Sequence, residues 1–144
     1  MFKFGKSTGE LFTELKREKN PGDWRNRNQE EFVLPLNEYL EKLLAEKNLS
    51  KSEVIERSGL NREYAYHIFG GIKKNPSRPK LLALALAMDL TLDEVQYLLR
   101  YAKQAVLYPR NPWDAVIISA IEQKLSVMQT NELLHRLGEN ILLN

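Results

Sequence analysis

The fold is decided by residues 49–68, which read LSKSEVIERSGLNREYAYHI. Ser50 precedes Glu53 by three positions, which is the capping-box pattern that opens a helix, and Asn61 can cap a second helix. Gly59 lies between them and suits the sharp turn that ends the first helix. The segment therefore predicts two short helices joined by a tight turn, which is the layout of a helix-turn-helix.

The second predicted helix has one apolar and one polar face. The side chains that hold it on the first helix are Val54, Ile55, Leu60, Ala65 and Ile68. The side chains left on the outward face, near the helix start, are Arg62, Glu63, Tyr66 and His67. In the major groove of DNA, arginine pairs with guanine, glutamate accepts from the cytosine amino group, and tyrosine or histidine can hydrogen-bond or cover a thymine methyl. We therefore expect these four residues to read bases.

A basic segment follows the helix pair. Residues 70–80 carry four cations and no acidic side chain, and residues 47–80 carry eight basic and three acidic residues, a net charge of +5. Because the whole chain has a net charge of +2, the remainder is negative. Cations, helix N-termini and small polar groups bind phosphate. The expected contacts to the DNA backbone are Ser50, Lys51, Asn61, Lys73, Lys74, Asn75 and Arg78.

The rest of the chain also predicts helices. Capping and proline signals with apolar spacing predict them over residues 7–20, 35–47, 79–89, 92–102, 112–124 and 126–138, whereas residues 20–28 look like a polar connector in which Trp24 docks. No segment alternates as a strand would, so the fold class is all-α. The expected organisation is an N-terminal helix and connector (1–33), a central domain (34–107) and a C-terminal helical pair (108–144).

Composition excludes several classes of protein. The chain has 144 residues, 43% of them hydrophobic, so it can bury a core, and it has no cysteine and hence no disulfide or thiolate metal site. No apolar run approaches the roughly 20 residues that cross a bilayer. We expect a cytoplasmic protein that makes no membrane contact and needs no cofactor.

Beyond the helix pair, residues 36–99 resemble the Cro/C1-repressor type of helix-turn-helix, the XRE family. The resemblance rests on the Leu49-Ser50 opening, the Gly59 turn, the Asn61 cap, and two later runs, Asn75-Pro76-Ser77 and residues 90–95 (LTLDEV). It implies a lambda repressor-like domain of five helices, a recognition helix at about 61–69, and often a homodimer on a near-palindromic operator in double-stranded DNA. The expected function is a sequence-specific transcriptional regulator, most simply a repressor.

The sequence departs from the family pattern at three positions. Ile55 stands where a small alanine is usual, and Ala65 stands where a branched aliphatic is usual. The two positions face each other across the motif, so we predict that Ile55 and Ala65 touch in a swap of sizes that conserves core volume. Phe69 replaces a glutamate that often pairs with arginine, so that ion pair is expected to be missing.

Two other interpretations compete with DNA binding. An enzyme is disfavoured, because Glu132 and His135 have the spacing of only half a carboxylate metal site and no phosphate loop or nucleophile motif occurs. The alternative is a helix-turn-helix fold used as a protein-interaction adaptor. Apolar residues of the C-terminal pair, and Phe2, Phe4, Leu11, Phe12 and Leu15 near the N-terminus, serve either a partner surface or the domain core.

Overall fold

The computed structural model describes residues 5–143, and Phe2 and Phe4 lie outside them. The helices are α1 (Thr8–Arg17), α2 (Pro21–Arg27), α3 (Leu36–Lys47), α4 (Lys51–Ser58), α5 (Arg62–Phe69), α6 (Arg78–Ala87), α7 (Leu92–Tyr101), α8 (Pro112–Glu122) and α9 (Val127–Arg136), with a turn of 3-10 helix at Gln29–Glu31. No strand occurs within the described range, which confirms the all-α prediction. In that range no helix is long and apolar enough to cross a membrane.

The chain forms two compact units, Met1–Leu34 and Pro35–Asn144. In the first unit, the prediction that residues 20–28 form a connector is wrong, because Pro21–Arg27 is helical. The side chain of Asn20 accepts a hydrogen bond from the backbone N–H of Asp23 and caps this helix, and Pro21 occupies its first turn. Trp24 is 4% exposed, so the prediction that it docks is confirmed.

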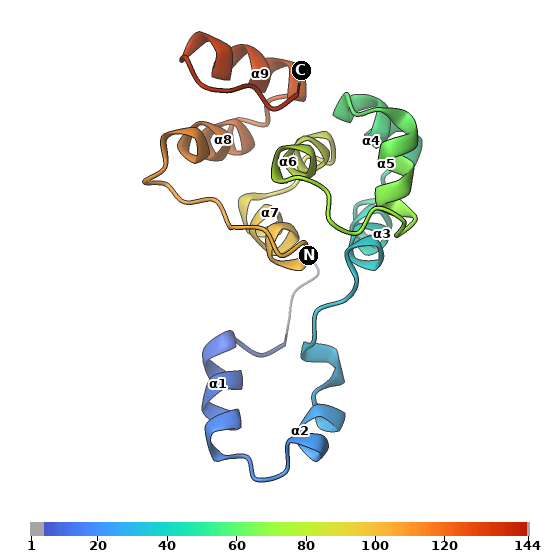
Figure 1. The fold of residues 1–144 in the computed structure, drawn as a ribbon, viewed down its shortest axis with the longest axis vertical. Coiled ribbons are helices and arrows are strands. Elements are labelled where there is room, and N and C mark those ends of the chain that lie inside the picture. The colour runs from blue at the N-terminus through green and yellow to red at the C-terminus, as the bar shows by residue number, and fades with distance from the viewer. Residues whose placement is uncertain (1–4, 144) are drawn as a thin grey trace. The chain divides into compact units, whose positions relative to one another are not determined.

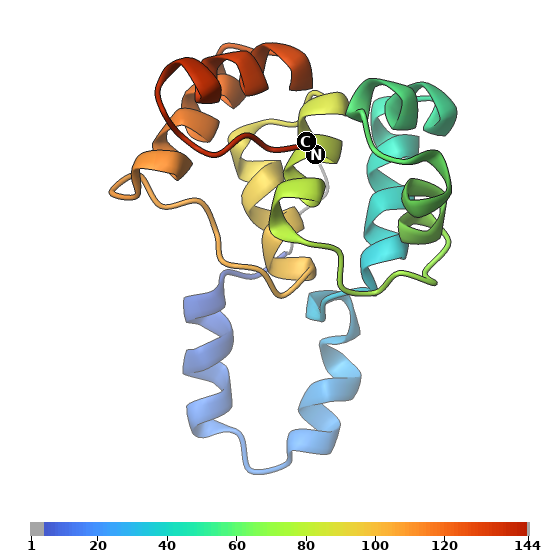
Figure 2. The same ribbon diagram turned by 45° about the horizontal axis from the view of Figure 1, so that its top comes forward.

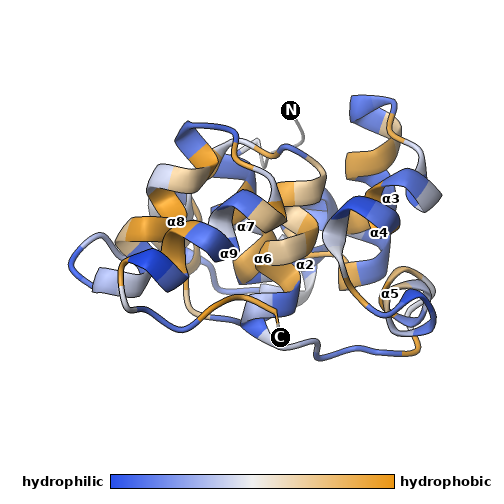
Figure 3. Ribbon diagram, turned by 90° about the horizontal axis from the view of Figure 1, so that it is seen from above, coloured by the Kyte–Doolittle hydropathy of each residue, from blue (hydrophilic) through white to orange (hydrophobic). Residues whose placement is uncertain are grey.

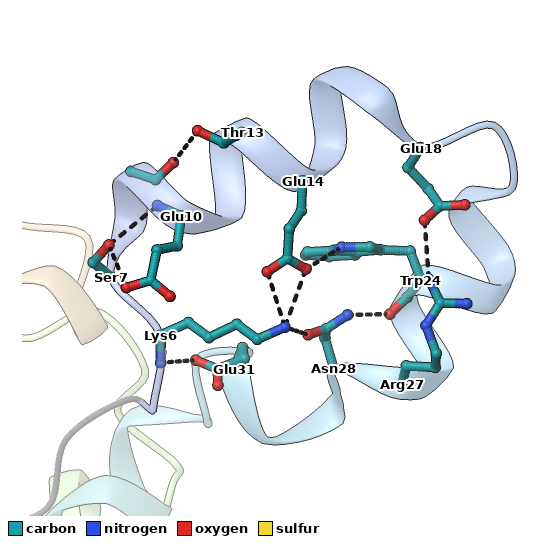
Figure 4. Close-up of polar contacts among 11 residues, drawn as sticks. Lys6, Ser7, Glu10, Thr13, Glu14, Glu18, Trp24, Arg27, Asn28 and Glu31 are labelled. Carbon is teal, nitrogen blue, oxygen red and sulfur yellow. Dashed lines mark hydrogen bonds and ion pairs between the residues drawn. The ribbon is translucent and has the colours of Figure 1, made fainter.

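A polar network ties α1 to α2 around this tryptophan (Figure 4). The indole N–H of Trp24 donates to Glu14 over 3.0 Å, and the ammonium of Lys6 donates to Glu14 and to the side-chain oxygen of Asn28. These hydrogen bonds, that of Lys6 foremost, hold the pKa of Glu14 below its usual value. The network gives a small helical hairpin one fixed arrangement.

The first unit also leaves apolar side chains uncovered. Phe12 is 62% exposed, and a shallow groove of about 230 Å³ is lined by Leu11, Phe12, Leu15, Trp24 and Phe32 together with Thr8 and Glu31. No residue of α1 is buried. A hairpin of this size therefore buries its tryptophan but not its apolar stripe.

The second unit is built around α6 (Figure 1). Residues 81–87 of this helix are all buried, as its uniformly apolar sequence predicts, and Figure 3 shows it apolar between its neighbours. Helix α6 contacts α4, α7 and α9, while α3 contacts α5 and α7. The helix begins at Arg78, one residue before the predicted start, and the Ser77 side chain makes no capping hydrogen bond.

Helices α3 and α7 are joined by an aromatic stack and an ion pair. The rings of Tyr39 and Tyr101 stack with centroids 4.0 Å apart and planes 2° apart. Lys47 lies 2.9 Å from Glu94, which is 2% exposed and forms the capping box of α7 with Thr91. Burial raises the pKa of Glu94, but its hydrogen bonds from Thr91 and from Lys47 bring that pKa below the usual value. Both contacts fix α3, against which α5 packs.

The C-terminal helices pack on this core. Helix α8 contacts α7, and α9 contacts α6 and α8. After α9 the chain turns back (Figure 2), where Asn140 accepts a hydrogen bond from the Trp113 indole and the Leu142 N–H donates to Asn131. Its end reaches the turn between α4 and α5, since a methyl group at Gly59 would lie 3.4 Å from the Leu143 Cδ1 atom. These helices therefore enlarge the core.

Ile55 and Ala65 are 3% and 0% exposed and lie on α4 and α5, which contact each other. Replacing Ile55 by alanine is expected to lower the free energy of unfolding by about 2–5 kcal/mol, because the buried site loses the transfer free energy of the removed atoms and keeps part of the cavity that they leave. Ala65→Val in the same chain should refill the space, with a coupling energy of about 0.5 kcal/mol or more. Urea unfolding of the wild type, both single variants and the double variant measures this coupling. Strictly additive effects would show that the two side chains do not touch.

Candidate nucleic-acid interface

The helices of the candidate interface begin at the residues that the sequence predicts. Ser50 accepts a hydrogen bond from the backbone N–H of Glu53, and Asn61 accepts one from the N–H of Tyr64 over 3.0 Å, so both side chains cap their helices as predicted. The capping box at Ser50 is only half formed, because the Glu53 side chain does not bond back to the Ser50 N–H. Helix α4 ends at Gly59, whose φ of 73° explains the glycine there. Because the carbonyl oxygen of the Asn61 side chain is used in the cap, only its NH₂ group remains to meet a phosphate.

The outward face of α5 carries the four predicted base-reading residues in two i, i+4 pairs. The guanidinium of Arg62 lies 5.6 Å from the centroid of the Tyr66 ring, and both side chains are exposed. Glu63 lies 3.9 Å from His67, and its side chain is 81% exposed. The arginine therefore rests on an aromatic ring and not on the neighbouring carboxylate. Its donors stay available to a new acceptor.

The loop after α5 is pinned at both ends. The Gly71 N–H donates to the carbonyl of Ile68, and the Lys73 N–H donates to that of His67 over 2.9 Å. Gly71 has a φ of 82°, and a methyl group there would come 3.1 Å from Asn37 on α3. At the far end Pro76 is buried, and its carbonyl accepts a hydrogen bond from Gln104. The loop thus presents its side chains from a fixed backbone.

Two basic side chains, Lys73 of this loop and Lys80 of α6, lie beside α5. The ammonium groups of Lys73 and Lys80 lie 5.7 and 4.2 Å from the centroid of the Tyr64 ring. Lys74 and Asn75 are exposed. Within residues 5–143, neither Lys73 nor Lys74 has an ion-pair partner. Because no acidic side chain in this range neutralises them, both lysines can attract an external anion.

Lys51 sits at the start of α4 and has two neighbours. Its ammonium pairs with Glu41 and lies 5.5 Å from the ring of Phe69, which is buried. The glutamate side chain is 46% exposed, and an ion pair this exposed contributes at most about 1 kcal/mol. A phosphate at the helix N-terminus can therefore replace it.

The structure gives Arg78 a different role from the predicted phosphate contact. Its guanidinium makes two 2.9 Å hydrogen bonds to the Asp114 carboxylate and donates to the carbonyls of Ala105 and Val106. Its side chain is only 20% exposed. These acceptors use the planar fork of donors, so Arg78 joins α6 to α8 and is not placed at the interface.

Two features of the interface could not be predicted from the sequence. The ammonium groups of Lys73 and Lys80 both lie close to the ring of Tyr64. The side chain of Ile72 is 73% exposed at the loop tip. A run of cations around one isolated aliphatic residue is a weak signal, because a loop sequence does not show which side chains face outward.

Metal chemistry finds no support elsewhere in the described chain. Glu132 and His135 are both exposed on α9. No group of three or more histidine, aspartate or glutamate residues that could hold a metal ion occurs among residues 5–143.

Comparison of the chain with protein-family models, with curated proteins and with solved structures finds no match.

Proposed function

We propose that the protein is a sequence-specific DNA-binding regulator whose helix α5 enters the major groove. One observation carries the proposal: the exposed face of a helix with its own cap presents Arg62 and Tyr66 beside a fixed basic loop. The second helix of a helix-turn-helix reads bases with the side chains of its first turns, and α5 is that helix here. Arg62 is the principal base reader, and Glu63, Tyr66 and His67 refine the choice.

The electrostatics support the same proposal. Lys73 and Lys74 have no acidic partner within the described residues, whereas Lys47 and Arg78 are held by buried carboxylates. Charge that is not neutralised internally is available for phosphate, and its neutralisation releases counterions. At the starts of α4 and α5, the phosphates of the DNA backbone are bound by Ser50, Lys51 and Asn61. Asn75 completes the contacts from the loop.

The resemblance of residues 36–99 to the Cro/C1 type extends the proposal. It implies a homodimer that binds two half-sites related by a dyad, most simply as a repressor in the cytoplasm. For such dimers the half-site centres lie about 34–36 Å, or one helical turn, apart. No cofactor and no catalytic step is part of this function.

Selection of bound sequences from a random pool of duplexes tests the proposal, because it reports binding, specificity and symmetry together. We expect an enriched, near-palindromic site, bound with an affinity that falls steeply with salt. Lys73→Ala and Lys74→Ala should weaken all duplexes about equally and reduce the salt slope by about one each. A matched control is Lys124→Ala, which removes an exposed lysine that follows α8 and belongs neither to α5 nor to its loop. Unchanged slopes in both loop variants would contradict phosphate binding by this loop.

The second candidate is a helix-turn-helix fold that serves protein contact. It is favoured by one specific observation, the exposed apolar groove of the first unit that contains Phe12 and Phe32. If the pure protein binds no duplex at low salt, including duplexes from its own upstream region, this candidate replaces DNA binding. If duplex binding occurs and Phe12→Ser leaves it unchanged, the groove has no part in it.

A further inference from the structure

We propose that Ile72 makes an apolar contact with the groove of bound duplex DNA, through a thymine methyl or a deoxyribose. This inference rests on the proposed function and adds a residue to it. Ile72 lies at the tip of the loop that follows α5, between Gly71 and Lys73. Its side chain is 73% exposed, more than any other large apolar side chain of the described residues.

The exposure of Ile72 belongs to a fixed backbone. The residue before it donates to Ile68, and the residue after it donates to His67, both on the last turns of α5. Gly71 is held against Asn37 so closely that a methyl group there would come within 3.1 Å. The isoleucine is thus held outward at the end of the proposed recognition helix. Its χ1 is stiff because it is β-branched, so little side-chain entropy is lost on contact.

The surroundings of Ile72 indicate what it meets. Lys73 and Lys74 follow it directly, and residues 70–80 contain no acidic side chain. Of the exposed large apolar side chains described in the Pro35–Asn144 unit, Tyr66 and Ile72 are the two on α5 and its loop. A surface that is cationic and apolar in one small area suits a duplex, which offers phosphates beside thymine methyl groups and sugars.

Apolar and ionic contacts differ in their response to salt, and this separates Ile72 from the lysines. Ile72→Ser removes apolar contact and no charge, so the dissociation constant should rise about five- to tenfold at every salt concentration. The slope of log affinity against log salt should stay at the wild-type value. Lys74→Ala should instead reduce that slope by about one.

The test is a titration of the full chain against one selected duplex at several salt concentrations, by fluorescence anisotropy. Met128→Ser is the matched control, because Met128 is 72% exposed but lies on α9. It should bind like the wild type, and circular dichroism should show both serine variants folded. If the wild type binds with a steep salt slope and Ile72→Ser binds equally well, the inference is overturned and the proposed function stands. A flattened slope for Ile72→Ser would also overturn it, and a wild type that binds no duplex overturns both.

Replacing the thymines of the same duplex by deoxyuridine distinguishes the two apolar groups. If Ile72 meets a thymine methyl, this replacement weakens the wild type by a larger factor than it weakens Ile72→Ser. If Ile72 meets deoxyribose, the replacement weakens both proteins by the same factor, including any loss at Tyr66 or His67, while Ile72→Ser still binds more weakly than the wild type. Both outcomes support an apolar contact and differ only in its target.

Discussion

Replacing Asp114 by alanine is expected to lower the free energy of unfolding by about 3–5 kcal/mol, because it strands a guanidinium inside the protein. Asp114 is 4% exposed, and its carboxylate receives two hydrogen bonds from Arg78 and one from the backbone N–H of Tyr108, each of 2.9 Å. The carbonyls of Ala105 and Val106 continue to accept from Arg78 in the variant. This remaining pairing places the expected loss at the lower end of the range.

Urea unfolding followed by circular dichroism measures this loss, and the chain offers a matched control. Lys124→Ala removes an ion pair to Asp89 whose side chains are 62% and 61% exposed. Pairs of this kind contribute at most about 1 kcal/mol, so the control should unfold almost like the wild type. If Asp114→Ala is no less stable than Lys124→Ala, the buried pair does not hold α6 to α8.

The same carboxylate predicts a dependence of stability on pH. Burial raises the pKa of Asp114, but the hydrogen bonds from Arg78 and from the Tyr108 N–H bring it below its usual value. Since the folded pKa is lowered, the stabilisation is fully present above the unfolded value of about 3.9 and is lost as the pH falls through the folded pKa. The difference in stability between the wild type and Asp114→Asn should therefore shrink below about pH 4. A difference that stays constant from pH 7 to pH 3 would contradict this assignment.

The helix starts of this protein depend on signals within four consecutive residues, and such signals can be read from the sequence. Asn111-Pro112-Trp113-Asp114 opens α8 as predicted. Asn20-Pro21-Gly22-Asp23 has the same cap, proline and acidic residue and opens α2, where the sequence predicts a polar connector. The glycine favoured a turn, but the cap and the fixed φ of proline outweighed it. The same local signal therefore begins a helix at both sites.

Contacts between residues far apart in sequence could not be predicted in this way. Arg78 looks like one more cation of a basic loop, and its partner Asp114 lies 36 positions away. The gathering of Lys73 and Lys80 on Tyr64 likewise depends on how the loop returns to α6. Local caps and apolar periodicity predicted the helices and the outward face of α5. The packing of the helices was needed to show which cations of residues 70–80 hold the fold, as Arg78 does, and which remain available to a ligand.

Replacing Arg62 by alanine is expected to cost about 1–3 kcal/mol of binding to the selected duplex and to relax the preference at one base pair per half-site. Arg62 is exposed, lies over Tyr66, and is the one cation in the first turn of α5. In the proposed complex Arg62 pairs bidentately with guanine, and alanine cannot make that contact. A second selection with the variant, beside salt titrations, measures both effects.

The matched comparison for Arg62→Ala is Lys73→Ala. Lys73 is a cation on the same side of the molecule, and in our proposal it binds phosphate instead of a base. Lys73→Ala should weaken the selected and random duplexes by the same factor, whereas Arg62→Ala should weaken the selected duplex more and bring the two affinities together. Because Arg62 stacks on Tyr66 without a carboxylate partner in the described chain, its loss strands no buried charge, and the fold should stay as stable as the wild type. An Arg62→Ala protein that selects the same site with the same preference would show that α5 does not read bases through this side chain.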